Sequence, residues 1–182
     1  DSIYKSGQSL LRIIDDILDL SKIEAGKLEL QPEPIQIRGL LQEVENIFCN
    51  KTREKGVQFD LHITESPPAV LMLDETRIKQ IFFNLVSNAI KFTSDGRIDV
   101  RVRARPEKPL SAGSNGKKTA ELTIEVEDTG IGVPFDQHEI IFESFRQREG
   151  QKNREYGGTG LGLTITRKLV AMMHGKLSLK SR

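Results

Sequence analysis

The stretch ELTIEVEDTGIG, residues 121–132, alternates apolar and polar side chains and then ends in an acid followed by two glycines. Alternation with a period of two predicts a β-strand that carries Leu122, Ile124 and Val126 on one face. The same phase places Asp128 on that apolar face. We therefore expect its carboxylate to point toward the core, where a buried charge needs hydrogen-bond donors.

Asp128 also opens the sequence Asp-Thr-Gly-Ile-Gly, whose glycines, Gly130 and Gly132, leave room for a flat ligand against the backbone. An adenine amino group would be a suitable donor to the carboxylate. The plainer interpretation is an aspartate that caps a turn, because Asp-x-Gly sequences commonly do so. The inward phase favours the ligand.

The segments on either side of this stretch predict both strands and helices. Strands are expected at 57–63, 70–73 and 98–102, at 122–128 after a long loop at about 105–119, and from Lys176 onward. Helices are expected at 37–55, at 75–92 with Asp74 as N-cap, and from about 163 to 174. We therefore predict an α+β two-layer sandwich, in which helices cover one face of a mixed sheet.

An earlier helix precedes this domain, with apolar residues at three-four spacing along two adjacent stripes. One stripe holds Ile3, Leu10, Ile13, Ile17 and Leu20; the other holds Leu11, Ile14 and Leu18. A helix that is apolar on two flanks needs partner helices, so it is expected to belong to a bundle or a homodimer. We place the boundary near Gly26, which gives a helical segment at 1–26 and a domain at 27–182.

Asn84, Asn88 and Lys91 share one face of the helix predicted at 75–92. Asparagine is a poor residue in mid-helix, and its amide oxygen can bind Mg²⁺, while a nearby lysine can neutralise phosphate. A solvated polar face is the alternative, because Arg77 and Gln80 lie on it too. Taken alone, the pattern favours the polar face.

The glycine-rich stretch at 157–162 leads into the last predicted helix, whose free N-terminal amides could bind phosphate. It matches neither the dinucleotide fingerprint nor the Gly-Lys-Ser/Thr phosphate loop. Before it, Phe142 and Phe145 precede a polar run that ends at Tyr156. Residues 133–156 are either a hinged lid with an apolar foot or a surface loop whose phenylalanines lie in the core.

In this order, the four signals resemble the ATP-binding domain of sensor histidine kinases, in the superfamily that also holds gyrase, heat-shock chaperone and mismatch-repair ATPases. The residues that carry the resemblance are Asn84-x-x-x-Asn88-Ala89-x-Lys91-Phe92, Asp128-x-Gly130-x-Gly132, Phe142-x-x-Phe145 and Gly158-Thr159-Gly160-x-Gly162. The resemblance covers residues 28–182 and implies a Bergerat-type ATP-binding fold. It also makes the leading helix the end of the second helix of a dimerisation and histidine-phosphotransfer domain.

The resemblance implies a role for each motif. Asn88 would bind Mg²⁺ with Asn84 assisting, Lys91 would face the phosphates of ATP, and Asp128 would accept from the adenine amino group. The other nucleotide-binding residues would be Phe92, Gly130, Ile131, Gly132, Gly158, Thr159, Gly160, Leu161 and Gly162. Residues 133–156 would form the ATP lid. Two departures matter: Ser144 stands where the family commonly has proline, and the chain ends at Arg182, where the family usually adds another strand.

By the same resemblance, the chain would donate the γ-phosphoryl group of ATP to a histidine. His62, His138 and His174 do not match the acceptor pattern, so no catalytic residue is assigned and the acceptor is expected outside this chain. An ATP-hydrolysing clamp is one alternative, although its relatives have a glutamate where this chain has Asn84. A non-catalytic nucleotide-binding scaffold is another. The implied partners are the phosphotransfer helices of the parent protein and a response regulator.

The composition sets limits on the setting and partners of the chain. With 27 Lys and Arg against 26 Asp and Glu, the net charge of +1 gives no electrostatic reason to expect nucleic acid. Cys49 is the only cysteine, so a reducing, cytoplasmic setting fits best. No apolar run is long enough to cross a bilayer, so we expect a soluble segment without membrane contact, whether or not its parent is anchored.

Overall fold

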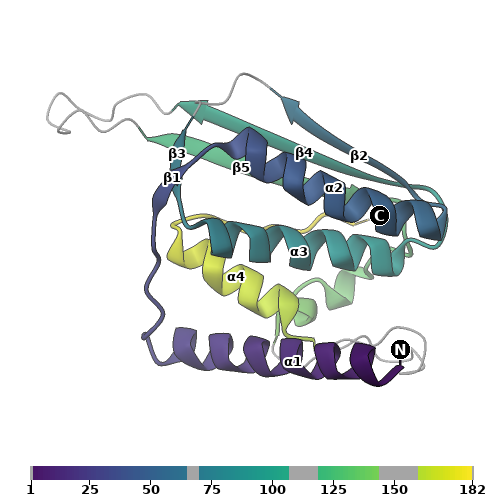
Figure 1. The fold of residues 1–182 in the computed structure, drawn as a ribbon, viewed down its shortest axis with the longest axis horizontal. Coiled ribbons are helices and arrows are strands. Elements are labelled where there is room, and N and C mark those ends of the chain that lie inside the picture. The colour runs from purple at the N-terminus through teal and green to yellow at the C-terminus, as the bar shows by residue number, and fades with distance from the viewer. Residues whose placement is uncertain (1, 65–69, 107–118, 144–159, 182) are drawn as a thin grey trace, which may run out of the picture. The chain divides into compact units, whose positions relative to one another are not determined.

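The computed structural model describes residues 2–64, 70–106, 119–143 and 160–181 (Figure 1). The chain divides into two compact units, one formed by residues 31–131 and the other by residues 1–30 together with 132–182. Within the described ranges, no helix is both long enough and apolar enough to cross a membrane.

The unit at 31–131 is built on a small mixed sheet. Its elements are β1 (Glu33–Ile35), α2 (Ile37–Lys55), β2 (Gln58–Thr64), β3 (Leu71–Leu73), α3 (Glu75–Phe92), β4 (Arg97–Pro106) and β5 (Ala120–Asp128). The strand order is β2-β4-β5, with β2 parallel and β5 antiparallel to β4, and β1 and β3 form a separate antiparallel pair. The mixed α+β class is confirmed.

The two helices of this unit end where local sequence signals place their ends. Gly56 adopts φ 75° after α2, and its N–H donates to the carbonyls of Arg53 and Thr52. This left-handed conformation favours glycine. At the start of α3, the Asp74 carboxylate accepts from the N–H of Arg77 at 3.0 Å, as expected for an N-cap. Its second oxygen accepts from the N–H of Gln31 at 2.9 Å.

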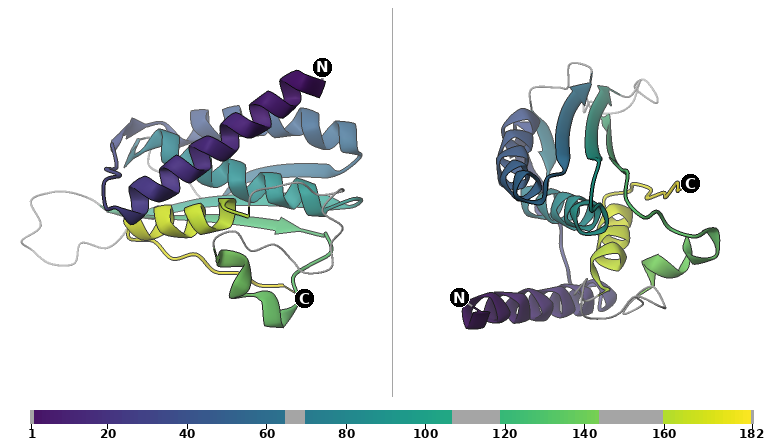
Figure 2. Two further views of the ribbon diagram at one scale, coloured as in Figure 1. Left: turned by 90° about the horizontal axis from the view of Figure 1, so that it is seen from below. Right: turned by 90° about the vertical axis from the view of Figure 1, so that its right-hand side faces the viewer.

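Helices α2 and α3 cover one face of the sheet, as both figures show (Figures 1 and 2). The inward residues of β4 are buried, and so are Phe48 of α2 and Phe82 of α3. The opposite face of the sheet carries ion pairs, with Arg101 2.9 Å from Glu127 and Arg103 2.6 Å from Glu125. One apolar and one charged face make this the two-layer arrangement that alternation predicts. The buried residues of β4 are Ile98, Val100, Val102 and Ala104.

Lys79 links the two helices through charge. Its ammonium lies 2.6 Å from Glu43 of α2 and 2.7 Å from Glu75 of α3. Hydrogen bonds to these carboxylates raise the pKa of Lys79 above its ordinary value of 10.5. A raised lysine pKa contributes stability that is complete below the ordinary value and is lost as the pH rises through the raised one.

Replacing Lys79 with methionine is therefore expected to lower the free energy of unfolding by about 0.5–1 kcal/mol at neutral pH. Urea unfolding measures the difference, which should shrink in high salt and at pH values well above 10.5. Lys27→Met, at an exposed position, is the matched control. A loss that persists unchanged in high salt would show that packing, not charge, holds the helices together.

The other unit holds α1 (Ser2–Glu24), the short 3₁₀ turns η1 (Phe135–Gln137) and η2 (Ile140–Phe142), and α4 (Gly162–Met172). The end of α1 contacts α4: Leu20 is buried, and Glu24 lies 3.3 Å from Lys168. Earlier along α1 the apolar stripes are uncovered, with Leu10 58%, Leu11 62% and Leu18 52% exposed. The helix thus leaves in water the surface that the sequence expects partner helices to cover.

Two other expectations concern loops and strands. Most of the predicted long loop, residues 107–118, lies outside the described residues.

The expectation of a strand from Lys176 is wrong, because residues 176–181 join no ladder. Burial still alternates along the segment: Leu177 and Leu179 are half-buried, whereas the residues on either side of them are exposed. The segment makes a side-chain bond instead, in which the Ser181 hydroxyl accepts from the N–H of Val133 at 2.8 Å. Alternation gives the facing of such a segment, but a strand also needs a partner backbone.

Candidate functional site

The candidate site in the unit at 31–131 lies at the C-terminal end of α3. Asn84, Asn88 and Lys91 follow one another at helical spacing, and each is half-buried. The Lys91 ammonium lies 4.8 Å from the centroid of the Phe92 ring, within reach of a cation–π contact. The C-terminal half of α3 thus holds two amides, a cation and an aromatic ring.

The loop after β5 packs against this end of α3. A Cβ atom at Gly130 would lie 2.5 Å from the Phe92 carbonyl oxygen and 2.9 Å from its carbon. The N–H of Ile131 donates to the same carbonyl at 3.3 Å. Only a residue without a side chain allows this approach. The structure therefore brings the predicted residues Phe92, Asp128, Gly130 and Ile131 together.

The expectation that the Asp128 carboxylate points into the core is wrong. Its register opposite the buried Ile98 confirms the predicted face. The side chain is nevertheless exposed, as are those of Glu127 and Thr129 beside it. Strand β5 is an outer strand of the described sheet, and its inward residues Leu122, Ile124 and Val126 are also only half-buried. Alternation predicts which face a residue takes, but not whether its strand lies at an edge of the sheet.

Asp128 also forms the turn that the plainer interpretation expects. Its Oδ1 accepts from the N–H of Gly130 at 2.9 Å, whereas Oδ2 makes no hydrogen bond with the described residues. Beside it, Ile131 is 56% exposed, which is unusual for a large apolar side chain unless a partner covers it. One free carboxylate oxygen and one apolar surface suit the amino group and the ring face of adenine. The amide oxygens of Asn84 and Asn88 are ligands of the kind that Mg²⁺ prefers.

Lys55 is a neighbour of this site that sequence reasoning missed. From the last turn of α2, its ammonium donates to the carbonyl of Ile90 and, at 3.3 Å, to that of Lys91. These carbonyls belong to the last turn of α3, which has no intrahelical donors left for them. A lysine before a helix-ending glycine is ordinarily assigned to its own helix dipole. Its link to a second helix follows from the packing alone.

The remaining predicted residues belong to the other unit or lie outside the described residues. Gly132 and Gly160 adopt positive φ values of 65° and 71°, Leu161 is buried, and α4 begins at Gly162. Gly158 and Thr159 lie outside the described residues, as do Ser144 and Phe145.

Part of the predicted lid, residues 133–143, is described. The carbonyl of Phe142 accepts from the Thr164 hydroxyl of α4 at 2.9 Å, and the Arg167 guanidinium lies 5.8 Å from the Phe142 ring. These contacts hold the end of the described segment, at Phe142, against α4. His138 Nε2 lies 3.0 Å from the Val133 carbonyl oxygen, which gives this histidine a role in holding the segment itself.

The family model for histidine kinase-, DNA gyrase B- and HSP90-like ATPases matches residues 73–182, which include α3, the Asp128 turn and α4. The chain belongs to this family. The resemblance that the four motifs carry is thereby confirmed, and the end of α3 with the Asp128 turn is part of an ATP-binding domain. The carboxylate, the two amides and the lysine found there agree with membership of a family of ATPases.

Curated relatives include sensor kinases of two bacteria. The chain is 42% identical over 182 residues to the signal transduction histidine-protein kinase BarA of Escherichia coli K12, and covers 19% of that protein. It is 42% identical over 185 residues to the autoinducer 2 sensor kinase/phosphatase LuxQ of Vibrio vulnificus, and covers 20% of it. All of the chain is aligned in both comparisons. The chain thus spans about a fifth of the length of these relatives.

Solved structures of histidine kinases share the fold. Full-length ShkA in complex with AMPPNP matches 99% of the chain with a TM-score of 0.74 and 30% identity, over 35% of the ShkA chain. The catalytic domain of ThkA, free of nucleotide, matches 84% with a TM-score of 0.58 and 25% identity, over 88% of that domain. These matches confirm the predicted sandwich of a mixed sheet and helices.

Proposed function

We propose that this chain is the catalytic ATP-binding domain of a sensor histidine kinase, which binds Mg-ATP and donates the γ-phosphoryl group to a histidine outside the chain. The observation that carries the proposal is the Asp128 turn packed against the end of α3. It places a free carboxylate oxygen and the exposed Ile131 beside Phe92. Phosphoryl transfer is proposed as the reaction because the relatives BarA and LuxQ are named as kinases.

Each part of the site has a role in this proposal. Asp128 Oδ2 accepts from the adenine amino group, and Ile131 and Phe92 lie against the ring. Asn88, assisted by Asn84, binds Mg²⁺, and Lys91 faces the phosphates. The sequence resemblance also assigns Gly132 and residues 158–162 to the binding of the phosphates. When bound, Mg²⁺ would neutralise negative charge on the phosphate oxygens.

Phosphoryl transfer depends on the positioning of the reacting groups and on charge neutralisation more than on a catalytic base. The bond between the γ-phosphorus and the oxygen that bridges it to the β-phosphate breaks, and a bond from phosphorus to an imidazole nitrogen of the acceptor forms. ADP leaves with the bridging oxygen. His62 and His174 are exposed on β2 and after α4, and His138 bonds Val133, so none is placed as the acceptor.

Hydrolysis of ATP by a conformational clamp is the second candidate, because the family includes such ATPases. Water attack benefits from a carboxylate that can take a proton. Asn84 occupies the position where the sequence resemblance expects that carboxylate in a clamp, and an amide cannot take a proton. The asparagine therefore favours transfer to another acceptor over hydrolysis.

The proposal extends to partners and setting. Exposed apolar stripes on α1 support homodimerisation through this helix, as the end of a dimerisation and phosphotransfer domain. The phosphorylated histidine would pass its phosphoryl group to a response regulator; ThkA, 25% identical to this chain, was solved in complex with the response regulator TrrA. The last part of the proposal is that the chain acts in the cytoplasm.

The decisive experiment combines the chain with the histidine-bearing helical segment of its parent protein and Mg-ATP labelled at the γ-phosphate. We expect an acid-labile, base-stable label on that segment, and none when its histidine is replaced by glutamine. Steady release of free phosphate by the chain alone, without any labelled histidine, would favour the clamp. Failure to bind ATP at all would remove the kinase and the clamp together.

Asn88→Ala tests the metal role. We expect the variant to keep its fold and to bind nucleotide equally well with and without Mg²⁺, because the amide oxygen that would ligate the ion is gone. Isothermal titration with ATP at several magnesium concentrations measures this dependence. Asn50→Ala, at an exposed position of α2, removes an amide elsewhere and should leave the dependence unchanged. If Asn88→Ala responds to magnesium as the wild type does, another residue binds the ion.

A further inference from the structure

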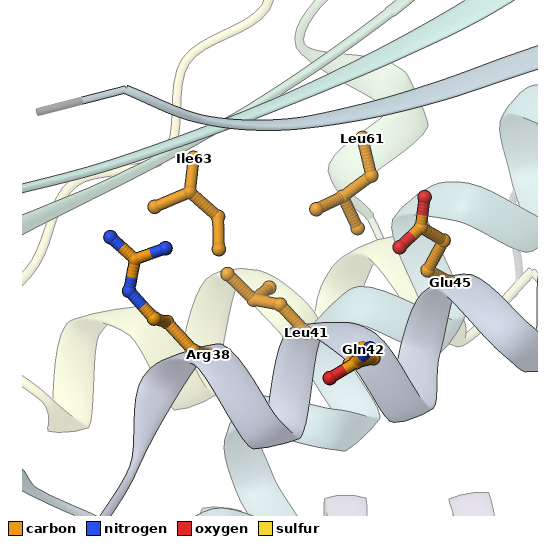
Figure 3. A pocket seen from close by; sticks show the side chains of 6 residues that line it. All are labelled: Arg38, Leu41, Gln42, Glu45, Leu61 and Ile63. Carbon is orange, nitrogen blue, oxygen red and sulfur yellow. The ribbon is translucent and has the colours of Figure 1, made fainter.

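A groove lies between α2 and β2, away from the end of α3. It is a cavity of about 360 Å³, lined by Arg38, Leu41, Gln42, Glu45, Leu61 and Ile63 (Figure 3). The α2 residues recur at helical spacing, so they form one continuous face. Nothing in the proposed nucleotide chemistry uses this groove.

The floor of the groove is apolar. Leu41 is fully buried, while Leu61 and Ile63 point from β2 toward α2 and remain half-exposed (Figure 3). Inward-facing residues of a covered sheet are ordinarily buried, as those of β4 are. Leu61 and Ile63 are not, because β2 is the outermost strand of the described sheet. The uncovered apolar surface therefore follows the edge of the sheet.

The backbone of β2 is also available along this edge. The N–H of Gln58 donates to the Gly96 carbonyl at 2.9 Å at the start of the β2–β4 ladder. In a parallel ladder, alternate residues direct their backbone groups to the same neighbour. Those of Phe59, Leu61 and Ile63 consequently point to the other side, where an added strand could pair with them.

Opposite charges stand at the two ends of the groove. The Arg38 guanidinium lies near Ile63, and the Glu45 carboxylate lies near Leu61, with Leu41 between them (Figure 3). Seven residues of helix separate their backbones by about 10 Å. Neither side chain forms an ion pair or a side-chain hydrogen bond with the described residues. An occupant with an acid at one end and a base at the other would complement both.

We propose that this groove binds an extended segment of a partner protein, added to the sheet as an antiparallel strand along β2. Strand β2 runs from the Glu45 end toward the Arg38 end, so an antiparallel segment meets Arg38 first. Its inward residues then read acid, apolar and base at alternate positions, Glu-x-Leu-x-Lys. These three positions span about 13 Å, which long side chains adjust to the separation of the two charges.

The test uses a capped octapeptide with Glu-Thr-Leu-Thr-Lys at its centre, labelled for fluorescence anisotropy, and the whole chain. We expect saturable binding that weakens about tenfold in the double variant Arg38→Glu/Glu45→Arg. The reversed peptide, Lys-Thr-Leu-Thr-Glu, should show the opposite preference and bind the double variant better. Arg53→Glu/Glu54→Arg swaps exposed charges elsewhere on α2 and should change neither affinity. ATP affinity should be the same in the wild type and in both double variants.

Backbone pairing gives an independent readout. Methylating the peptide nitrogens that would face β2 should abolish binding, and the amide signals of Phe59, Leu61 and Ile63 should shift on titration of the unmodified peptide. Binding that ignores both charge swaps and methylation would overturn the proposal. So would sedimentation showing that the groove is covered by a second copy of the chain, with self-association lost in Arg38→Glu/Glu45→Arg.

Discussion

Replacing Gly130 with alanine is expected to destabilise the fold and to weaken ATP binding together. The new Cβ would lie 2.5 Å from the Phe92 carbonyl oxygen and 2.7 Å from Asp128 Oδ1, so the turn must move off the end of α3. Overpacking against backbone that cannot yield costs about 1–3 kcal/mol. Urea unfolding and ATP titration measure the two losses.

Gly39→Ala is the matched control. Gly39 lies inside α2, and a Cβ atom added there would meet nothing within 4 Å. Alanine there should stabilise the protein by about 0.5–1 kcal/mol, because glycine is the weaker helix former. If Gly130→Ala proved as harmless as Gly39→Ala, the close packing of the Asp128 turn on Phe92 would be contradicted.

Asp128→Asn is expected to abolish the preference for adenine while keeping the turn. The asparagine carbonyl can still accept from the N–H of Gly130, so the fold should survive. Its amide nitrogen, however, presents a donor to the adenine amino group, where the carboxylate presents an acceptor. Loss of a charged hydrogen bond with such a mismatch should weaken ATP binding by about a hundredfold.

Competition titrations with ATP and GTP check this result. The wild type should favour ATP strongly, because guanine carries an acceptor oxygen where Asp128 expects a donor. Glu127→Gln removes the same charge from the adjacent residue on the opposite face of β5, and should alter neither affinity. Equal affinity of the wild-type chain for both nucleotides would remove Asp128 from this role.

Most of the fold could be predicted from local patterns in the sequence. Helix α2 begins at Ile37 and ends at Lys55, and α3 runs from Glu75 to Phe92, both as the spacing, Gly56 and Asp74 indicate. Periodicity also gave the inward faces of β4 and β5. These features are encoded within one turn of helix or within neighbouring residues, which is why a single sequence reveals them.

The features that were missed depend on contacts between distant segments. Strand β1 contains Pro34 and exists because it pairs with β3, whereas residues 176–181 alternate but have no such partner. The exposure of Asp128 depends on the place of β5 at an edge of the described sheet. The bond from Lys55 to the end of α3 joins positions 35 residues apart in the chain. No local pattern carries that information.

The uncovered stripes of α1 also bear on how the chain responds to heat. If copies of the chain cover these stripes for one another, folded and associated protein is favoured by mass action. The melting temperature should then climb as the protein is concentrated, whereas a chain that stays single melts at one temperature whatever its amount. Replacing Leu11 and Leu18 with glutamine should flatten that dependence, since both are more than half exposed.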